Sequence, residues 1–267
     1  MKPTALLSAL LIAIAGAVAG PAMAETVKIG VVPGVYGDSV EALVPEAKAA
    51  GIDLEVIEFS DWTTPNEALQ AGDLDLNYFQ HVPFLNNAIK QKGYKIVPIG
   101  VGTLANIGIY SLKHKDFASV PEGAKVAIAN DPVNQGRGLL LLEKGGLIKL
   151  KPGVGYLGTL DDIVENPKKV TFSEVEGPQL ARITADVDVA LGYPHFIIAA
   201  KTFDPGSALI YSGIDDKQFA IVFAANAAKA DNPALKKVVE LYQSSKAVRD
   251  AIDAGFAHNP KLYTIAW

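Results

Sequence analysis

Short apolar runs alternate with segments of helical periodicity along most of the chain. Runs rich in Val, Ile and aromatic residues are typical of strands, whereas apolar residues spaced three and four positions apart are typical of helices. Their regular alternation predicts an α/β fold with mostly parallel sheets. The predicted strands cover residues 26–32, 54–59, 74–78, 96–101, 107–111, 125–129, 170–174, 187–191 and 219–224, and the predicted helices residues 39–50, 64–71, 83–92 and 233–254.

The strands fall into two α/β units, and the last predicted strand, at residues 219–224, returns to the first unit. Two such units predict two lobes with a ligand cleft between them. We expect residues 25–106 and 220–267 to form lobe 1, and residues 107–219 to form lobe 2.

The first 24 residues form a predicted signal peptide. Lys2 gives a positive start, an apolar run extends from about Ala5 to Val18, and Ala22-Met23-Ala24 has the small-x-small pattern of a cleavage site. The run is shorter than the roughly 20 apolar residues that a transmembrane helix needs. We therefore expect cleavage near Ala24 and a mature protein secreted to the periplasm.

Cysteine content and charge narrow the class of protein further. The chain contains no cysteine, so it forms no disulfide, and no cysteine near the cleavage site could carry a lipid. We expect a soluble protein with no direct membrane anchor. The formal net charge is −5, and Lys and Arg are not clustered as a nucleic-acid-binding surface requires. Nucleic acid is therefore excluded as a partner.

The segment from Asn130 to Gly136 joins a predicted strand to a helix that carries Arg137. Backbone N–H groups at a helix start favour an anion, and the guanidinium of an arginine suits a carboxylate. The segment predicts an anion site that includes Asn134 and Arg137. The alternative is an ordinary connecting loop whose arginine forms a surface ion pair.

A second candidate segment runs from Asn77 to Phe84 at the end of a strand in the other predicted lobe. Ligands of open α/β sheets bind beyond the carboxyl ends of the strands, and aromatic walls bury apolar groups. Phe79, His81 and Phe84 could line such a pocket, or they could simply pack in the core. Trp62 is a similar case, and its ring could be either a pocket wall or a partly buried surface.

Motifs for catalysis are lacking. The sequence has no G-x-S-x-G, no phosphate-binding P-loop and no H-E-x-x-H. Its four histidines have no metal-ligand spacing, and cysteine ligands are absent. We expect no enzyme activity, no cofactor and no metal.

At these segments the sequence resembles the MetQ/NlpA family, the methionine-binding components of ABC importers, over essentially the whole mature chain. The resemblance implies a type II-like periplasmic-binding-protein fold whose two lobes enclose a single amino acid. It is carried by PNEAL at 65–69, NYFQH at 77–81, NDPVNQGR at 130–137, LLLLEK at 139–144, GLIKLK at 146–151, DIVENP at 162–167 and PQL at 178–180.

The resemblance also implies residue roles. Arg137 would hold the ligand carboxylate, with Asn134 in the same segment. The side-chain pocket would be lined by Phe79, His81 and Phe84, with Trp62 where the family usually has tyrosine.

Two positions depart from the family pattern. Tyr193 occupies a position where the family has a ligand-contacting asparagine, and Ala220 replaces a second asparagine. An unpaired buried polar group costs roughly 1–3 kcal/mol. Methionine should therefore bind poorly unless Asn106, Tyr193 or His195 supplies the missing contact.

The resulting prediction is a periplasmic substrate-binding protein that delivers a small amino-acid-like ligand, methionine or a related compound, to an ABC permease and its ATPase. One alternative is a ligand sensor for a membrane receptor. Another is a periplasmic enzyme that uses His81 or His195.

Overall fold

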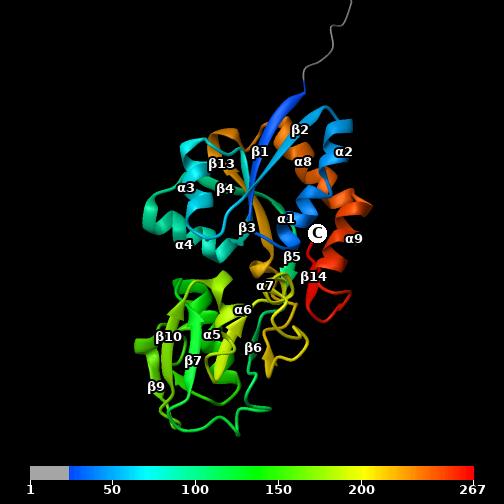
Figure 1. The fold of residues 1–267 in the computed structure, drawn as a ribbon. Coiled ribbons are helices and arrows are strands. Elements are labelled where there is room, and N and C mark those ends of the chain that lie inside the picture. The colour runs from blue at the N-terminus through cyan, green and yellow to red at the C-terminus, as the bar shows by residue number, and fades with distance from the viewer. Residues whose placement is uncertain (1–23) are drawn as a thin grey trace, which may run out of the picture.

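The computed structural model describes residues 24–267 and shows two lobes, each built on a five-stranded sheet (Figure 1). Apart from Ala24, the predicted signal peptide lies outside the described residues. The predicted α/β fold with two lobes is therefore confirmed. The division of the chain at residues 106/107 and 219/220 remains our proposal, although every strand of each sheet falls on the expected side.

The sheet of lobe 1 has the strand order β2-β1-β3-β13-β4. β1 is parallel to both of its neighbours, whereas β13 returns from far along the chain and is antiparallel to β3 and β4. All six residues of β3 are buried, as expected for a central strand covered on both faces. The bounds are β1 Glu25–Val31, β2 Ile52–Glu58, β3 Leu76–His81, β4 Ile96–Val101 and β13 Ile221–Asn226.

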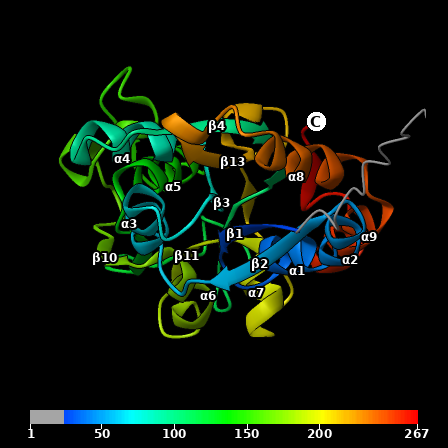
Figure 2. The same cartoon turned by 90° about the horizontal axis from the view of Figure 1, so that it is seen from above.

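Six helices surround this sheet. Viewed from above, α3 and α4 lie to one side of the lobe, and α1, α2, α8 and α9 lie to the other (Figure 2). The bounds are α1 Val35–Glu41, α2 Val44–Ala49, α3 Thr64–Ala71, α4 Val82–Lys92, α8 Pro233–Ser244 and α9 Lys246–Gly255.

The sheet of lobe 2 has the order β10-β7-β11-β6-β12, with β7 parallel to β10 and β11 and with β6 antiparallel to β11 and β12. Its strands are β6 Gly108–Tyr110, β7 Lys125–Ala129, β10 Thr171–Val175, β11 Val189–Gly192 and β12 Ile210–Tyr211, and its helices are α5 Pro132–Lys144, α6 Leu180–Ile183 and α7 Pro194–Ala200. The remaining short elements are β8 Lys149–Leu150, β9 Ile163–Glu165, and the 3-10 turns η1 Gly155–Leu157, η2 Leu160–Asp162, η3 Gly177–Gln179, η4 Lys217–Phe219 and η5 Ala227–Lys229.

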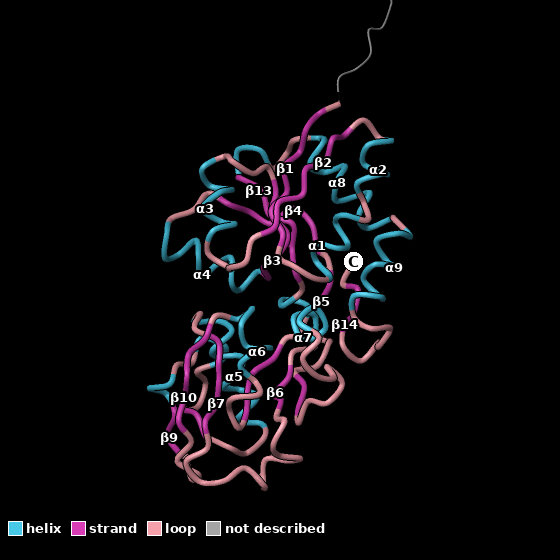
Figure 3. Tube along the Cα trace, viewed as in Figure 1, coloured by secondary structure: helices cyan, strands magenta, loops and turns pink. Residues whose placement is uncertain are grey.

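The lobes are joined beside a small two-stranded sheet of β5 (Thr103–Ala105) and β14 (Tyr263–Ile265), visible between the lobes in Figure 3. Asn106 follows β5 and binds two other stretches of chain here. Its carboxamide donates to the carbonyl of Lys261 at 2.8 Å and accepts from the N–H of Gly213 at 2.8 Å. The connection thus includes the C-terminal segment.

Three predicted elements are wrong in detail. The predicted helix 39–50 is two helices, and the second has Pro45, which lacks a backbone N–H, in its first turn. The predicted helix 233–254 is also two, because Ser245 has an extended conformation and caps α9 through the N–H of Val248. The predicted loop 130–136 is mostly helix, since α5 begins at Pro132.

The main hydrophobic core is one continuous cluster that includes buried residues of both lobes, and a smaller cluster lies beneath α3 and α4. Within residues 24–267, no helix has the length and apolar character to cross a membrane.

Candidate functional site

His81, the last residue of β3, lies at the interface of the two lobes. Its Nδ1 atom accepts the backbone N–H of Phe84 at 3.2 Å and so caps α4. An accepting Nδ1 carries no proton, so the neutral ring must carry its proton on Nε2. That Nε2–H group therefore donates to Oδ1 of Asn134 in lobe 2, at 3.2 Å.

Asn134 is oriented by Asp131, the N-cap residue of α5. Asp131 accepts the backbone N–H of Asn134 at 2.9 Å, and the Nδ2 group of Asn134 lies 3.1 Å from each oxygen of the same carboxylate. Because Nδ2 faces Asp131, Oδ1 must face His81 and Arg137. Asp131 therefore already accepts a backbone N–H group at the start of the helix. Because that N–H group is not free for a ligand, the predicted anion site depends on Arg137.

Arg137 is 8% exposed and projects from α5 into the same region. Its Nη1 group donates to Oδ1 of Asn134 at 3.0 Å, and its guanidinium lies 4.1 Å from the centre of the Phe219 ring. No ion pair between this guanidinium and a carboxylate occurs within residues 24–267. Burial lowers the pKa of Arg137, but an arginine stays protonated in proteins. A buried positive charge is therefore available for an anion.

The two histidines of the site are neutral. Burial, reinforced by the charge of Arg137, lowers the pKa of His81 to about 3. Burial lowers the pKa of His195 to about 3 as well. Nη1 of Arg137 lies 3.3 Å from Nε2 of His81, but both atoms carry protons, so this contact is not a hydrogen bond.

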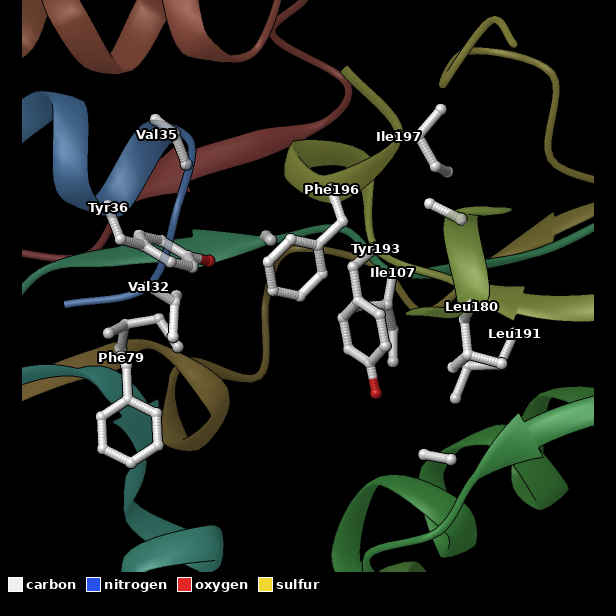
Figure 4. Close-up of a cluster of buried hydrophobic side chains, with 14 of the residues drawn as sticks. Val32, Val35, Tyr36, Phe79, Ile107, Leu180, Leu191, Tyr193, Phe196 and Ile197 are labelled. Atoms are coloured by element: carbon white, nitrogen blue, oxygen red, sulfur yellow. The ribbon is translucent and has the colours of Figure 1, made fainter. Parts of the chain in front are cut away.

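Aromatic rings from both lobes gather in the same region as Arg137. The Trp62 ring of lobe 1 lies edge-on to the Tyr193 ring of lobe 2, with 5.3 Å between the ring centroids. The centroid of the Phe84 ring lies 6.1 Å from that of Trp62. The Tyr36 ring at the start of α1 lies 4.6 Å from His195 of α7. Figure 4 shows Tyr36 and Phe79 of lobe 1 in one buried cluster with Tyr193 and Phe196.

These side chains surround a cavity of about 40 Å³, taken as the space open to the centres of water-sized molecules. That is room for roughly three waters. A ligand of amino-acid size is larger, so the rings or the lobes must move apart to admit it.

Eight of the nine residues that we predicted to bind ligand line this cavity. They are Trp62, Phe79, His81, Phe84, Asn134, Arg137, Tyr193 and His195. Asn106 does not, because its carboxamide is engaged at the connection between the lobes, although its neighbours Ala105 and Ile107 line the cavity. Ala220, the second position at which we expected a departure from the family pattern, is buried and does not line the cavity.

Sequence reasoning missed several lining residues, notably Tyr36 and Phe219. Tyr36 follows the carboxyl end of β1, where the rule for open α/β sheets could have indicated it. Phe219 lies in the short turn η4, and nothing in its sequence context indicates that it covers Arg137.

Comparison with known proteins decides the family. Residues 27–261 match the NlpA lipoprotein family. The chain belongs to this family. Its NlpA-family relatives include the D-methionine-binding lipoprotein MetQ of Salmonella typhimurium, 40% identical over 227 residues, which are 84% of each chain. The same protein of Escherichia coli K12 is 39% identical over 227 residues, again 84% of each chain.

Solved structures of similar proteins share the fold. A nutrient binding protein from Burkholderia cenocepacia bound to methionine has a TM-score of 0.84 and 39% identity, covering 90% of this chain and 100% of the other. The methionine binding protein MetQ has a TM-score of 0.80 and 37% identity, covering 87% and 95%. The two-lobed binding-protein fold of the NlpA family is thus shown for this chain.

Three polar atoms of this NlpA-family site have no hydrogen-bond partner in the part of the chain that the structure describes. They are Nε1 of Trp62, the hydroxyl of Tyr193 and Nδ1 of His195, all buried. Buried polar groups are normally paired, so three such atoms around one cavity indicate a place for polar ligand atoms. Among residues 24–267, no group of His, Asp and Glu side chains could hold a metal ion.

Proposed function

We propose that this NlpA-family protein is the substrate-binding component of an ABC importer and captures a small amino-acid-like carboxylate between its lobes. The observation that carries the proposal is the buried Arg137, which has no ion-pair partner among the carboxylates of residues 24–267 and lines a cavity walled by rings from both lobes. Burying an unpaired charge is costly, so a site that retains one is suited to an anionic ligand.

The names of the relatives support an amino acid as the starting candidate. Two of them are described as D-methionine-binding, and one solved relative contains methionine. Methionine or a related compound would place its carboxylate on Arg137 and its apolar chain against Phe79, Phe84 and Trp62. Burying about 100 Å² of apolar chain contributes roughly 2.5 kcal/mol.

In this proposal the protein works in the periplasm without a direct membrane anchor and does not convert its ligand. Closure of the lobes over the ligand presents a surface to the permease, and the ATPase then drives release. Ligand shifts the population toward the closed form because only that form contacts it from both lobes.

The test is calorimetric titration of the purified protein with D- and L-methionine, alongside mass spectrometry of any compound that co-purifies. Arg137→Met, which keeps the length of the side chain and removes its charge, should weaken carboxylate binding at least a hundredfold. Arg182→Met is the matched control, since Arg182 is an exposed arginine of the same lobe. Equal carboxylate affinities for Arg137→Met and the wild type would refute the assignment.

A further inference from the structure

The cavity that Arg137 lines is too small for an amino acid in this conformation. It measures about 40 Å³, which is room for roughly three waters. Separation of the lobes admits a ligand, but the closed complex must still hold that ligand between them. At least one side chain of the cavity wall must therefore take another position when ligand is bound. The aromatic and histidine rings are the candidates, since they make up most of the wall.

Most of these rings are fixed by burial. The fixed rings, each at most 5% exposed, are those of Tyr36, Phe79, His81, Tyr193 and His195. Protein interiors are close-packed, so a buried ring has no free volume beside it to move into. Of the described residues that line the cavity, three have half-buried rings: Trp62, Phe84 and Phe219. The ring that makes room for a ligand is one of these three.

Trp62 and Phe84 border a second pocket, of about 260 Å³ by the same measure. Much of the surface inside this pocket is polar. Its lining residues include Asn66, Asn87, Gln91, Asn130, Asp131 and Glu176. An apolar ring that moved there would cover polar groups without offering them hydrogen bonds, which is costly. This pocket is therefore a poor destination for either ring.

Phe219 borders a third pocket, of about 310 Å³, whose inner surface is mostly apolar. Arg137 and Phe219 line both this pocket and the ligand cavity. We call it the leucine-lined pocket, because its other apolar lining residues are Leu104, Leu140, Leu141 and Tyr156. An apolar cavity of about 150 Å³ can hold a benzene molecule. The leucine-lined pocket can therefore receive the phenyl ring of Phe219.

The Phe219 ring is at present the aromatic partner of the guanidinium. Its centroid lies 4.1 Å from Cζ of Arg137, and the ring lies edge-on to His81 of lobe 1, with 5.1 Å between centroids. A carboxylate forms charge-assisted hydrogen bonds with a guanidinium, and these are stronger than a cation–π contact with a phenyl ring. A ligand carboxylate can therefore replace the ring as the partner of Arg137.

The backbone around Phe219 leaves the side chain free to change its rotamer. Phe219 ends the short turn η4, and residues 215–218 before it are exposed. Its N–H group donates to the carbonyl of Asp216 at 3.2 Å, within the same turn, and β13 begins only at Ile221. A phenylalanine side chain can occupy any of three staggered positions about its Cα–Cβ bond. The ring can therefore swing without breaking a bond of the sheet.

We propose that Phe219 is a displaceable plug of the ligand cavity, and that an amino acid whose carboxylate binds Arg137 moves its ring into the leucine-lined pocket. This inference rests on the proposed function, because the ligand that displaces the ring is the one held by Arg137. Phe219 then sets the size of ligand that the closed form accepts. The leucine-lined pocket contributes to binding without contacting the ligand.

The test is a double-mutant cycle between the ring and its destination. Leu140→Trp fills the leucine-lined pocket, and Phe219→Ala removes the ring. D- and L-methionine are titrated by calorimetry into the purified mature protein and its variants. Leu140→Trp should weaken binding about tenfold when Phe219 is present, and less than about threefold in the Phe219→Ala background. Leu157→Trp is the control, because Leu157 is an exposed leucine of η1 that does not line the pocket.

Phe219→Ala alone distinguishes a plug from an ordinary wall of the site. A plug competes with the ligand, so its removal should strengthen methionine binding about threefold and speed association about fivefold in stopped-flow measurements. A wall residue contributes contacts, so its removal would weaken binding. Thermal unfolding establishes that each variant is folded, and the Phe219→Ala measurements decide by themselves if Leu140→Trp does not fold.

Two results would overturn this inference and leave the proposed function standing. One is an equal effect of Leu140→Trp with and without the Phe219 ring. The other is weaker methionine binding by folded Phe219→Ala than by the wild type. If neither the wild type nor Phe219→Ala binds either methionine enantiomer, both the inference and the proposed function fail.

Discussion

The indole edge of Trp62 lies directly on the backbone of Gly177, so that a Cβ atom at position 177 would come within 2.0 Å of Cη2 of the ring. Trp62 follows β2 in lobe 1, and Gly177 begins η3 in lobe 2. The two lobes therefore meet at the rim of the cavity through a contact that only glycine permits.

Gly177→Ala should impair closure of the lobes. The added methyl group collides with the indole ring, so we expect ligand affinity to fall at least tenfold in calorimetry while the unfolding midpoint changes little. Combining it with Trp62→Phe, which lacks the benzo ring at the collision, should recover part of the closure that the methyl group prevents. If Gly177→Ala binds as tightly as the wild type, the contact is not needed for closure.

Stability should fall as the pH is lowered, because of the buried histidines. The pKa of His195 is about 3 in the folded protein, below the ordinary value of about 6.5. Between these values the unfolded chain binds a proton that the folded protein does not, so the free energy of unfolding decreases as the pH falls from about 6.5 toward 3. By pH 5 the loss is about 2 kcal/mol for this histidine, and His81 adds a similar amount.

Urea unfolding at pH 7 and pH 5 measures this effect. His195→Phe keeps a ring at the position and should reduce the difference between the two pH values by roughly half. His258→Asn is the control, because the His258 side chain is 73% exposed. A pH dependence that survives in His195→Phe undiminished would contradict the assignment to His195.

A buried hydroxyl network should stabilise lobe 1 independently of ligand. The Tyr242 hydroxyl lies 2.9 Å from Oγ of Ser39 and donates to the Tyr78 hydroxyl at 3.0 Å. Tyr242→Phe leaves these partners incompletely paired and should lower the free energy of unfolding by about 1–3 kcal/mol. Tyr263→Phe, at a half-buried position, should cost less in the same urea titration. Equal losses in the two variants would argue against the network.

Much of the fold could be predicted from local pattern. The strands beginning near residues 26, 96 and 125 are apolar runs bounded by polar or glycine-containing segments, so their positions were clear. The breaks in the helical segments were missed because amphipathic periodicity continues across them. Ser245 could have indicated the second break, since a serine three residues before Val248 is a typical N-cap.

The candidate site was predictable where it depends on strand ends. His81 ends β3, and Arg137 lies on α5, the helix that follows the carboxyl end of β7. The carboxyl ends of such strands meet at a cleft between lobes. Asn106 could not be placed in this way. Whether its carboxamide faces a cavity or backbone groups depends on the position of Lys261, which is 155 residues away in sequence.

The bonds of Asn106 restrict how the lobes can move. They hold the stretch after β5 to Gly213, which lies just after β12, and to Lys261 near the C-terminus. A point held by two such bonds allows rotation but little sliding, so displacement grows with distance from it. Spectroscopic labels should accordingly report large changes between residues flanking Trp62 and Gly177, and almost none between residues flanking Asn106 and Gly213.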